Sequence, residues 1–384
     1  MVTLAPLVTE ITSDLDISYS QMGTILGAWQ LIYIVSAIPL GILLDRIGVR
    51  RAIMFAFAMI AMSVVLRSYA EGYASLFLAV AIFGLGGPLI SVGAPKSISL
   101  WFDDTERGLA MGIYMTAPTL GSMTGLSLTN SLFMPLLEGD WRGVLLLYAA
   151  FIFFSSLVWW LITAHKGYKA IEERQSSRRP ESEHKNILRL IKIPAFQIVL
   201  TMAIGIFFFN HGFNNWLPEI LRAKGMNAVH AGNFASIPVF CAVISSLTIP
   251  RLAKPKWRIT ILFFIFLGFG LSSLALQASE DTYLFVALVL QGLARGSAMT
   301  LSILVLLDIP GVGKERAGVA GGMFFSAAEI GGVMGPVSIG IVSDISDGFS
   351  YPLYMLSGVS ILLLVLLVWL KTQKNLITNY KKSR

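Results

Sequence analysis

The chain alternates between long apolar runs and short polar segments. Ile17 to Leu44 contains no charged residue, and after a short charged interruption Ala52 to Leu66 is again charge-free. A helix needs about 20 mostly apolar residues to cross the hydrocarbon core of a bilayer. The two runs therefore predict two membrane-spanning helices, which the six or seven polar residues between them hold together as antiparallel neighbours.

The same pattern continues to the end of the chain and predicts an all-α integral membrane protein. Eleven full spans are expected near residues 18–44, 52–70, 74–100, 108–132, 143–164, 194–217, 229–250, 259–278, 282–307, 317–343 and 349–370. Between the fifth and the sixth lies a polar segment, 165–193, with no apolar period.

Composition supports this class. The chain is 55% hydrophobic and 13% charged, whereas a soluble domain carries about 25% charged residues. The net charge of +7 comes from basic residues in the loops, which argues against a nucleic-acid partner. The single Cys241 excludes an intrachain disulfide, and no Cys/His cluster suggests a metal or cofactor.

The distribution of Lys and Arg predicts the orientation. If the segment around Asp45 is cytoplasmic and the spans alternate, most of the 29 basic residues fall on the cytoplasmic side. The outer segments then hold only Arg67, Arg142, Arg222 and Lys224. This asymmetry predicts a multi-pass protein of the inner or plasma membrane with a cytoplasmic C-terminus.

The first polar segment has a regular set of glycines and charges: Gly41, Asp45, Arg46, Gly48, Arg50 and Arg51. Gly41 would permit close helix approach and Gly48 a tight turn. The pattern G-x-x-x-D-R-x-G-x-R-R resembles the loop 2–3 signature of the major facilitator superfamily. In that family the loop is a latch between helices at the cytoplasmic face, which implies that Asp45 is its central acceptor.

The two halves of the chain repeat. Residues 76–85 parallel residues 284–293 at an offset of 208, and residues 107–112 parallel residues 316–321 at an offset of 209. Two parallel six-helix halves joined by a long linker are the architecture of this family. The expected domains are an N-terminal bundle (1–164), a cytoplasmic linker (165–193), a C-terminal bundle (194–370) and a basic cytoplasmic tail (371–384).

The repeat also bears on the N-terminus. Leu4–Val8 parallels Trp216–Ile220, yet only five residues precede Pro6, whereas more than 20 helical residues are expected before Pro218. We therefore expect Met1–Ile11 to be the outer end of a first helix whose beginning is missing. In-frame upstream codons for about 15–20 mostly apolar residues would support this expectation.

Charged residues inside spans are costly and are candidates for function. Arg295, in the middle of its span, is expected either to bind an anion or to pair with Glu329. Glu329 is expected either to neutralise Arg295 or to take up a proton for coupling, because burial disfavours a carboxylate. Lys96 is expected to reach the membrane interface, with substrate binding as the alternative.

Uncharged polar residues extend this candidate set. Asn210, His211, Asn214 and Asn215 lie within six residues of one span and cannot all face lipid. They are expected to bind substrate, with His211 as a possible proton carrier, or to anchor the helix at the interface together with a Trp. Gln30 and Gln291 are weaker candidates, and Gln291 lies one turn before Arg295.

Two short stretches resemble the cyanate and nitrate/nitrite porters of the superfamily. They are Trp216-Leu217-Pro218 and Ser97-x-Ser99-x-Trp101-Phe102 with the following Arg107-Gly108-x-Ala110-x-Gly112. The arginine of the nitrate group in the second helix is absent, because residues 18–44 hold no basic residue. Nitrate is therefore not predicted.

Together these features predict a secondary active transporter, not an enzyme, that moves a small organic or inorganic anion by alternating access. The expected partners are a small-molecule substrate, the bilayer and a coupling proton or ion, and the expected state is a monomer. The alternatives are a drug or metabolite exporter and a non-transporting sensor of the same fold. An intramembrane enzyme is disfavoured, because the spans show no set of acids, nucleophile or metal ligands at one depth.

Overall fold

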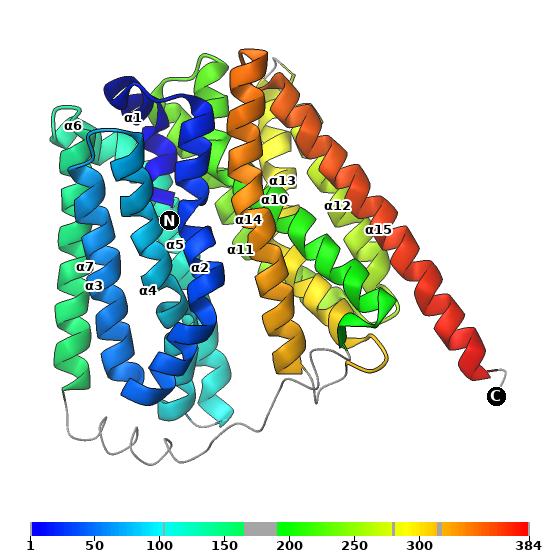
Figure 1. Ribbon diagram of the computed structural model, residues 1–384. Coiled ribbons are helices and arrows are strands. Elements are labelled where there is room, and N and C mark those ends of the chain that lie inside the picture. The colour runs from blue at the N-terminus through cyan, green and yellow to red at the C-terminus, as the bar shows by residue number, and fades with distance from the viewer. Residues whose placement is uncertain (1, 103, 165–189, 279–280, 313–316, 383–384) are drawn as a thin grey trace. The chain divides into compact units, whose positions relative to one another are not determined.

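The computed structural model describes residues 2–102, 104–164, 190–278, 281–312 and 317–382 (Figure 1). Within these ranges all regular secondary structure is helical. The chain divides into two compact units, Met1–Glu181 and Ser182–Arg384, and each is considered by itself. Most of the expected linker, residues 165–189, lies outside the described residues.

The described residues of the first unit form seven α-helices, a 3₁₀ turn and a π turn, coloured from blue through cyan to green in Figure 1. They are η1 (Val2–Leu7), α1 (Val8–Leu15), α2 (Tyr19–Ile47), α3 (Val49–Ser68), α4 (Tyr73–Trp101), α5 (Asp104–Leu128), the π turn η2 (Thr129–Phe133), α6 (Met134–Leu136) and α7 (Trp141–Thr163). A capping box starts α2, because Ser18 Oγ accepts from the Gln21 amide and Gln21 Oε1 from the Ser18 amide.

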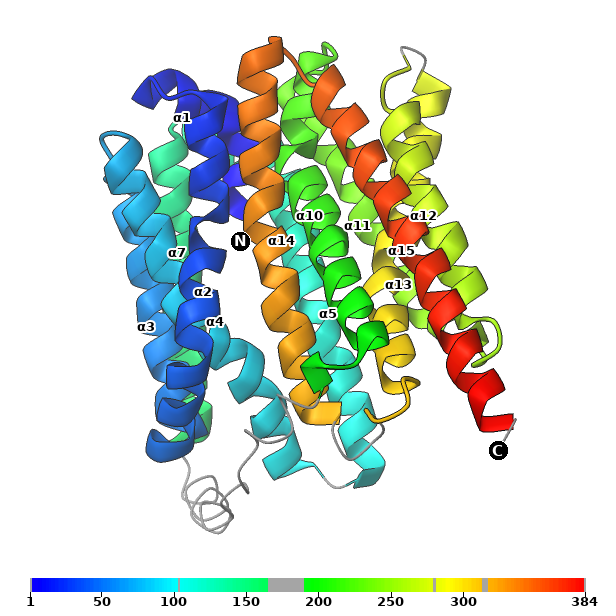
Figure 2. The same ribbon diagram turned by 45° about the vertical axis from the view of Figure 1, so that its right-hand side comes forward.

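In the second unit the described residues form six long helices, which can be followed in Figure 2. They are α10 (Pro194–Ala223), α11 (Ala228–Leu252), α12 (Arg258–Ala275), α13 (Asp281–Leu307), α14 (Ala317–Ser346) and α15 (Ser350–Lys382). Pro194 at the first position of α10 and Asn227 at the N-cap of α11 fit helix starts, and Asn227 Oδ1 accepts from the His230 amide at 2.8 Å.

Ten helices of the described chain are long and apolar enough to cross a membrane. Their outward faces are apolar: Phe153 of α7 is 70% exposed and Ile162 is 67% exposed. An exposed apolar surface of this kind would be unfavourable in water and is suited to contact with lipid. The span expected at 108–132 is present as α5 but is not among these ten.

In the first unit α4 is the central helix, and it packs against both α2 and α3. Gly84 makes the crossing with α2 close, because a Cβ there would overlap the carbonyl oxygen of Trp29. Ser36 of α2 donates from Oγ to the Gly84 carbonyl at 3.1 Å. This bond adds a buried polar link to the small-residue contact.

The second unit repeats this crossing. Its α13 packs against both α11 and α12, and a Cβ at Gly292 would overlap the carbonyl oxygen of Pro238 in α11. Ser245 of α11 donates from Oγ to the carbonyl of Leu293 in α13. Gly292 lies 208 residues after Gly84, and Ser245 lies 209 residues after Ser36. The sequence repeat is therefore also a repeat of helix packing.

Two expectations about the segment around Gly41 are wrong. The polar segment after Gly41 is not a loop of six or seven residues: α2 continues to Ile47, Gly48 has φ 84°, and α3 begins at Val49. No described atom lies within 4 Å of a Cβ built at Gly41, so there is no close helix approach there. At the other end, the helix α15 continues to Lys382, while its membrane-spanning part, Ser350–Gln373, agrees with the span expected near 349–370.

Candidate functional site

The centre of the candidate site is a hydrogen bond between α13 and α10. Arg295 lies near the middle of α13, and its Nη1 donates to Asn214 Oδ1 of α10 at 2.8 Å. Both side chains are half-buried. A neutral amide oxygen therefore accepts one of the five donors of the guanidinium, and the positive charge is kept.

The helix itself orients the Asn214 amide. Its Nδ2 donates to the backbone carbonyl of Asn210, one turn earlier, which leaves Oδ1 to face Arg295. Asn215 repeats this arrangement, with Nδ2 donating to the carbonyl of His211 at 2.9 Å. The His211 ring packs against Phe207 with centroids 5.3 Å apart. Two amides of the polar segment of α10 are thus bonded to the backbone of their own helix.

Glu329 does not pair with Arg295. It lies on α14, is 8% exposed, and its Oε2 has no hydrogen-bond partner among the described residues. The ion pairs of the described chain, formed by N and O atoms within 4.0 Å, do not include these two residues. Of the two alternatives for these residues, the one in which Glu329 neutralises Arg295 is therefore wrong, and Asn214 is the partner instead.

Two further amides near this pair have buried polar atoms without partners. Gln291, one turn before Arg295 on α13, is fully buried, and both its Nε2 and Oε1 lack a hydrogen-bond partner in the described residues. The same holds for Oδ1 of Asn210. Buried polar groups of this kind are rare in native proteins and call for an explanation such as a ligand, a water or another conformation.

Gln30 and Lys96 belong to the first unit. Gln30 is fully buried on α2. Lys96 does not extend alone to the interface: its Nζ lies 2.6 Å from Asp45 Oδ1. This ion pair joins α4 to the last turn of α2.

The remaining latch residues lie around the α2–α3 junction. Arg50, in the first turn of α3, donates from Nε to Thr163 Oγ1 of α7 at 3.2 Å, and its carbonyl accepts from Trp159 Nε1 at 3.4 Å. Arg46 and Arg51 are exposed. The latch signature thus connects α2 with α4 through Asp45, and α3 with α7 through Arg50.

Arg67, which was counted with the outer segments, is a buried charge in the last turn of α3. It lies inside α3, is 2% exposed, and donates from Nη2 to Ser63 Oγ at 3.0 Å. Its guanidinium carbon lies 5.6 Å from the ring centre of Phe83, while Nε has no partner in the part described. The four-residue spacing of Ser63 and Arg67 on one helix face was the available signal.

Trp216 is also not an interfacial anchor. Its side chain is fully buried, and Nε1 donates to the carbonyl of Pro336 in α14 at 3.0 Å. Pro336 lies inside α14. The hydrogen bond from Trp216 to its carbonyl therefore joins α10 to α14.

Comparisons with known proteins agree with this fold. A family model described as Major Facilitator Superfamily matches residues 1–277. The chain is 24% identical to the nitrite extrusion protein of Bacillus subtilis (strain 168), over all of this chain and 93% of that protein. It is 24% identical to a quinolone resistance transporter of Acinetobacter baumannii, over 94% of this chain and 88% of the relative.

A third relative is the probable galactarate/D-glucarate transporter GudP of Escherichia coli (strain K12), which is 23% identical over 95% of this chain and 87% of its own length. Among solved structures, the nucleoside transporter NupG has a TM-score of 0.71 at 15% identity, covering 96% of this chain and 94% of that chain. This structural likeness concerns the fold alone. The chain belongs to the Major Facilitator Superfamily and is a multi-pass membrane protein that transports a small solute.

Proposed function

We propose that this chain transports a small organic anion with a carboxylate group, and that Arg295 binds the carboxylate. The observation that supports the proposal is the Arg295–Asn214 hydrogen bond of 2.8 Å, formed in the absence of an acidic partner within 4.0 Å among the described residues. A guanidinium offers five donors in a planar fork that matches a carboxylate with two parallel bonds.

The position of Arg295 in the middle of its span also supports binding of an anion. A charge in the middle of a membrane helix costs about 2.5–3.5 kcal/mol on insertion scales. The Asn214 oxygen offsets part of this cost but does not neutralise the charge. An anionic substrate supplies the missing counter-charge, so substrate binding and charge neutralisation are one event.

The names of the relatives help to choose a class of substrate. By their names, one extrudes nitrite and another transports galactarate and D-glucarate, and all three are anions. We favour the organic acids, because a planar carboxylate fits the fork of Arg295 and the neighbouring amides Asn210 and Gln291 can bond to further polar groups. The quinolone resistance relative supports the second candidate, an exporter of drugs or metabolites.

We further propose proton coupling through Glu329, a cytoplasmic C-terminus and a monomeric state. Glu329 is buried and Oε2 lacks a partner, and a carboxyl in such surroundings avoids an uncompensated charge when it is protonated. The orientation rests on the excess of Lys and Arg in segments assigned to one side. His211 is a second candidate for a proton carrier, because it shares the polar turn with Asn215.

Transport by purified protein in liposomes tests the proposal. A pH gradient with the acidic side outside the liposomes, or preloaded unlabelled substrate, should drive accumulation of a labelled monocarboxylate or dicarboxylate sugar acid, and unlabelled analogues should compete. A methyl ester of the same acid should not compete, because it lacks the charge that Arg295 binds. Competition by esters or amines as strong as that by acids would contradict the anion proposal, and binding without movement would indicate a sensor.

A further inference from the structure

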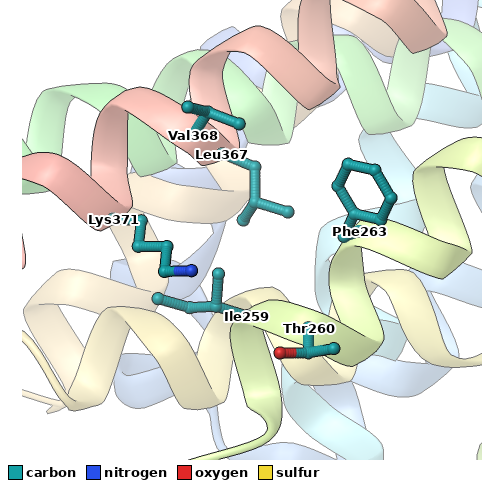
Figure 3. A pocket seen from close by; sticks show the side chains of 6 residues that line it. All are labelled: Ile259, Thr260, Phe263, Leu367, Val368 and Lys371. Carbon is teal, nitrogen blue, oxygen red and sulfur yellow. The ribbon is translucent and has the colours of Figure 1, made fainter.

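A groove between α12 and α15 lies apart from the site built around Arg295. Its volume is about 260 Å³. The lining residues are Ile259, Thr260 and Phe263 of α12, with Leu367, Val368 and Lys371 of α15 (Figure 3). Its walls are therefore apolar except for one hydroxyl and one amine. The two helices pack against each other along this stretch.

The groove lies at the end of the spans, where apolar sequence gives way to polar sequence. Between Ser350 and Leu370 helix α15 has no charged residue, and Lys371 is the first. On the other wall, Trp257 immediately precedes α12 and is 50% exposed. Trp at a helix end and Lys at the end of an apolar run are both typical of headgroup depth.

The charge at this end of the groove is unbalanced. The neighbouring Arg258 pairs with Asp308, with Nη1 2.7 Å from Oδ1. Lys371 takes part in none of the ion pairs of the described residues. Its nitrogen is turned toward the space between the two helices in Figure 3. An anionic group bound in the groove would therefore interact favourably with Lys371.

We propose that this groove binds an anionic glycerophospholipid. The lipid phosphate accepts hydrogen bonds from Lys371 Nζ and the Thr260 hydroxyl. An acyl chain lies along Phe263 and Val368, which are 39% and 54% exposed without it. A soluble anion would satisfy Lys371 but would leave the apolar walls uncovered, and a zwitterionic lipid would bring a second positive charge to the lysine.

Native mass spectrometry of delipidated protein in detergent tests this assignment. Phosphatidylglycerol and phosphatidylcholine with the same chains are titrated separately into wild type, Lys371→Gln and Lys254→Gln. Lys254 is an exposed lysine in the connection between α11 and α12 and does not line the groove, so its variant loses the same charge at the same end.

Wild type and Lys254→Gln should prefer phosphatidylglycerol by about fivefold, the contribution of one lysine near a charged headgroup. Lys371→Gln should lose this preference, whereas Thr260→Val should weaken the binding of both lipids, because both carry the phosphate that the hydroxyl binds. Equal loss in both lysine variants would mean general electrostatic attraction and would overturn the proposal. It would also be overturned by equal affinity of wild type for the two lipids, or by displacement of phosphatidylglycerol by free glycerol phosphate.

Discussion

The side chains of Asp45 and Lys96 form an ion pair, with Nζ 2.6 Å from Oδ1, that joins the end of α2 to α4. Asp45 is the acid of the latch signature, and Lys96 lies on the turn after Pro95 in α4. The pair is largely solvent-accessible, with 37% of the Lys96 side chain and 61% of the Asp45 side chain exposed. An ion pair this exposed contributes little to the stability of the fold.

The first prediction concerns this pair. Exposed ion pairs contribute about 0.2–1 kcal/mol to stability, so Asp45→Asn should change the melting temperature little. We expect it nevertheless to lower the transport rate markedly, because the latch loses its charged acceptor. Lys96→Gln should have the same effect, and the double variant should be no slower than either single one. Wild-type transport by Asp45→Asn would exclude the latch role.

The second prediction concerns the tight packing of α10 on α14. A Cβ added at Gly331 would overlap the backbone carbonyl oxygen of Ile204, and backbone cannot move away as a side chain can. Gly331→Ala should lower stability by about 1–3 kcal/mol. The measurement is thermal unfolding in detergent.

Gly322 provides the matched control for Gly331→Ala. It lies on the same helix, and no described atom is within 4 Å of its Cβ position. Gly322→Ala should be neutral or stabilising by about 0.5–1 kcal/mol, because glycine is a poor helix former. Equal destabilisation by both substitutions would mean that α14 is sensitive to any side chain and not to close packing.

Sequence reasoning succeeded where one periodic signal decided the answer. Apolar runs gave the spans, and the offset between the halves anticipated the matching crossings at Gly84 and Gly292. It failed at Gly41 and Arg67, because neither approach distance nor side-chain direction is encoded in local composition. The structure showed that Gly41 faces open space and that Arg67 turns back along α3 to Ser63.

The candidate site shows the same limit. Charge and depth were sufficient to single out Arg295 and Glu329, and helical spacing grouped Gln291 with Arg295. The partner of Arg295 was not predictable, because a neutral amide can accept a hydrogen bond from an arginine in a span as well as an acid can. The structure gives Asn214 as the partner, and this residue was itself a candidate for substrate binding.

The third prediction concerns Arg295. Arg295→Lys keeps the charge but cannot form two parallel bonds to a carboxylate, so substrate affinity should fall by about tenfold or more. Asn214→Asp should also weaken binding, because the new carboxylate would occupy the guanidinium in place of substrate. Isothermal titration on purified variants measures both. Unchanged affinity in Arg295→Ala would make Arg295 a structural charge.

The last prediction concerns Glu329, whose Oε2 is buried without a partner in the described part of the chain. If a proton on this carboxyl travels with the substrate, Glu329→Gln copies the protonated form permanently, because a carboxamide is neutral and of nearly the same shape. The variant should bind substrate as well as wild type or more tightly. It should still exchange internal for external substrate, since exchange needs no net proton movement.

Accumulation driven by a pH gradient should be lost in Glu329→Gln, and the residual transport should no longer depend on pH. Paired counterflow and gradient-driven uptake assays in liposomes separate these two activities. His211→Gln provides the comparison, because His211 is the other candidate for the proton. If Glu329→Gln accumulates substrate against a gradient while His211→Gln does not, the coupling residue is His211. If both variants accumulate it, the coupling ion is not a proton bound at either residue.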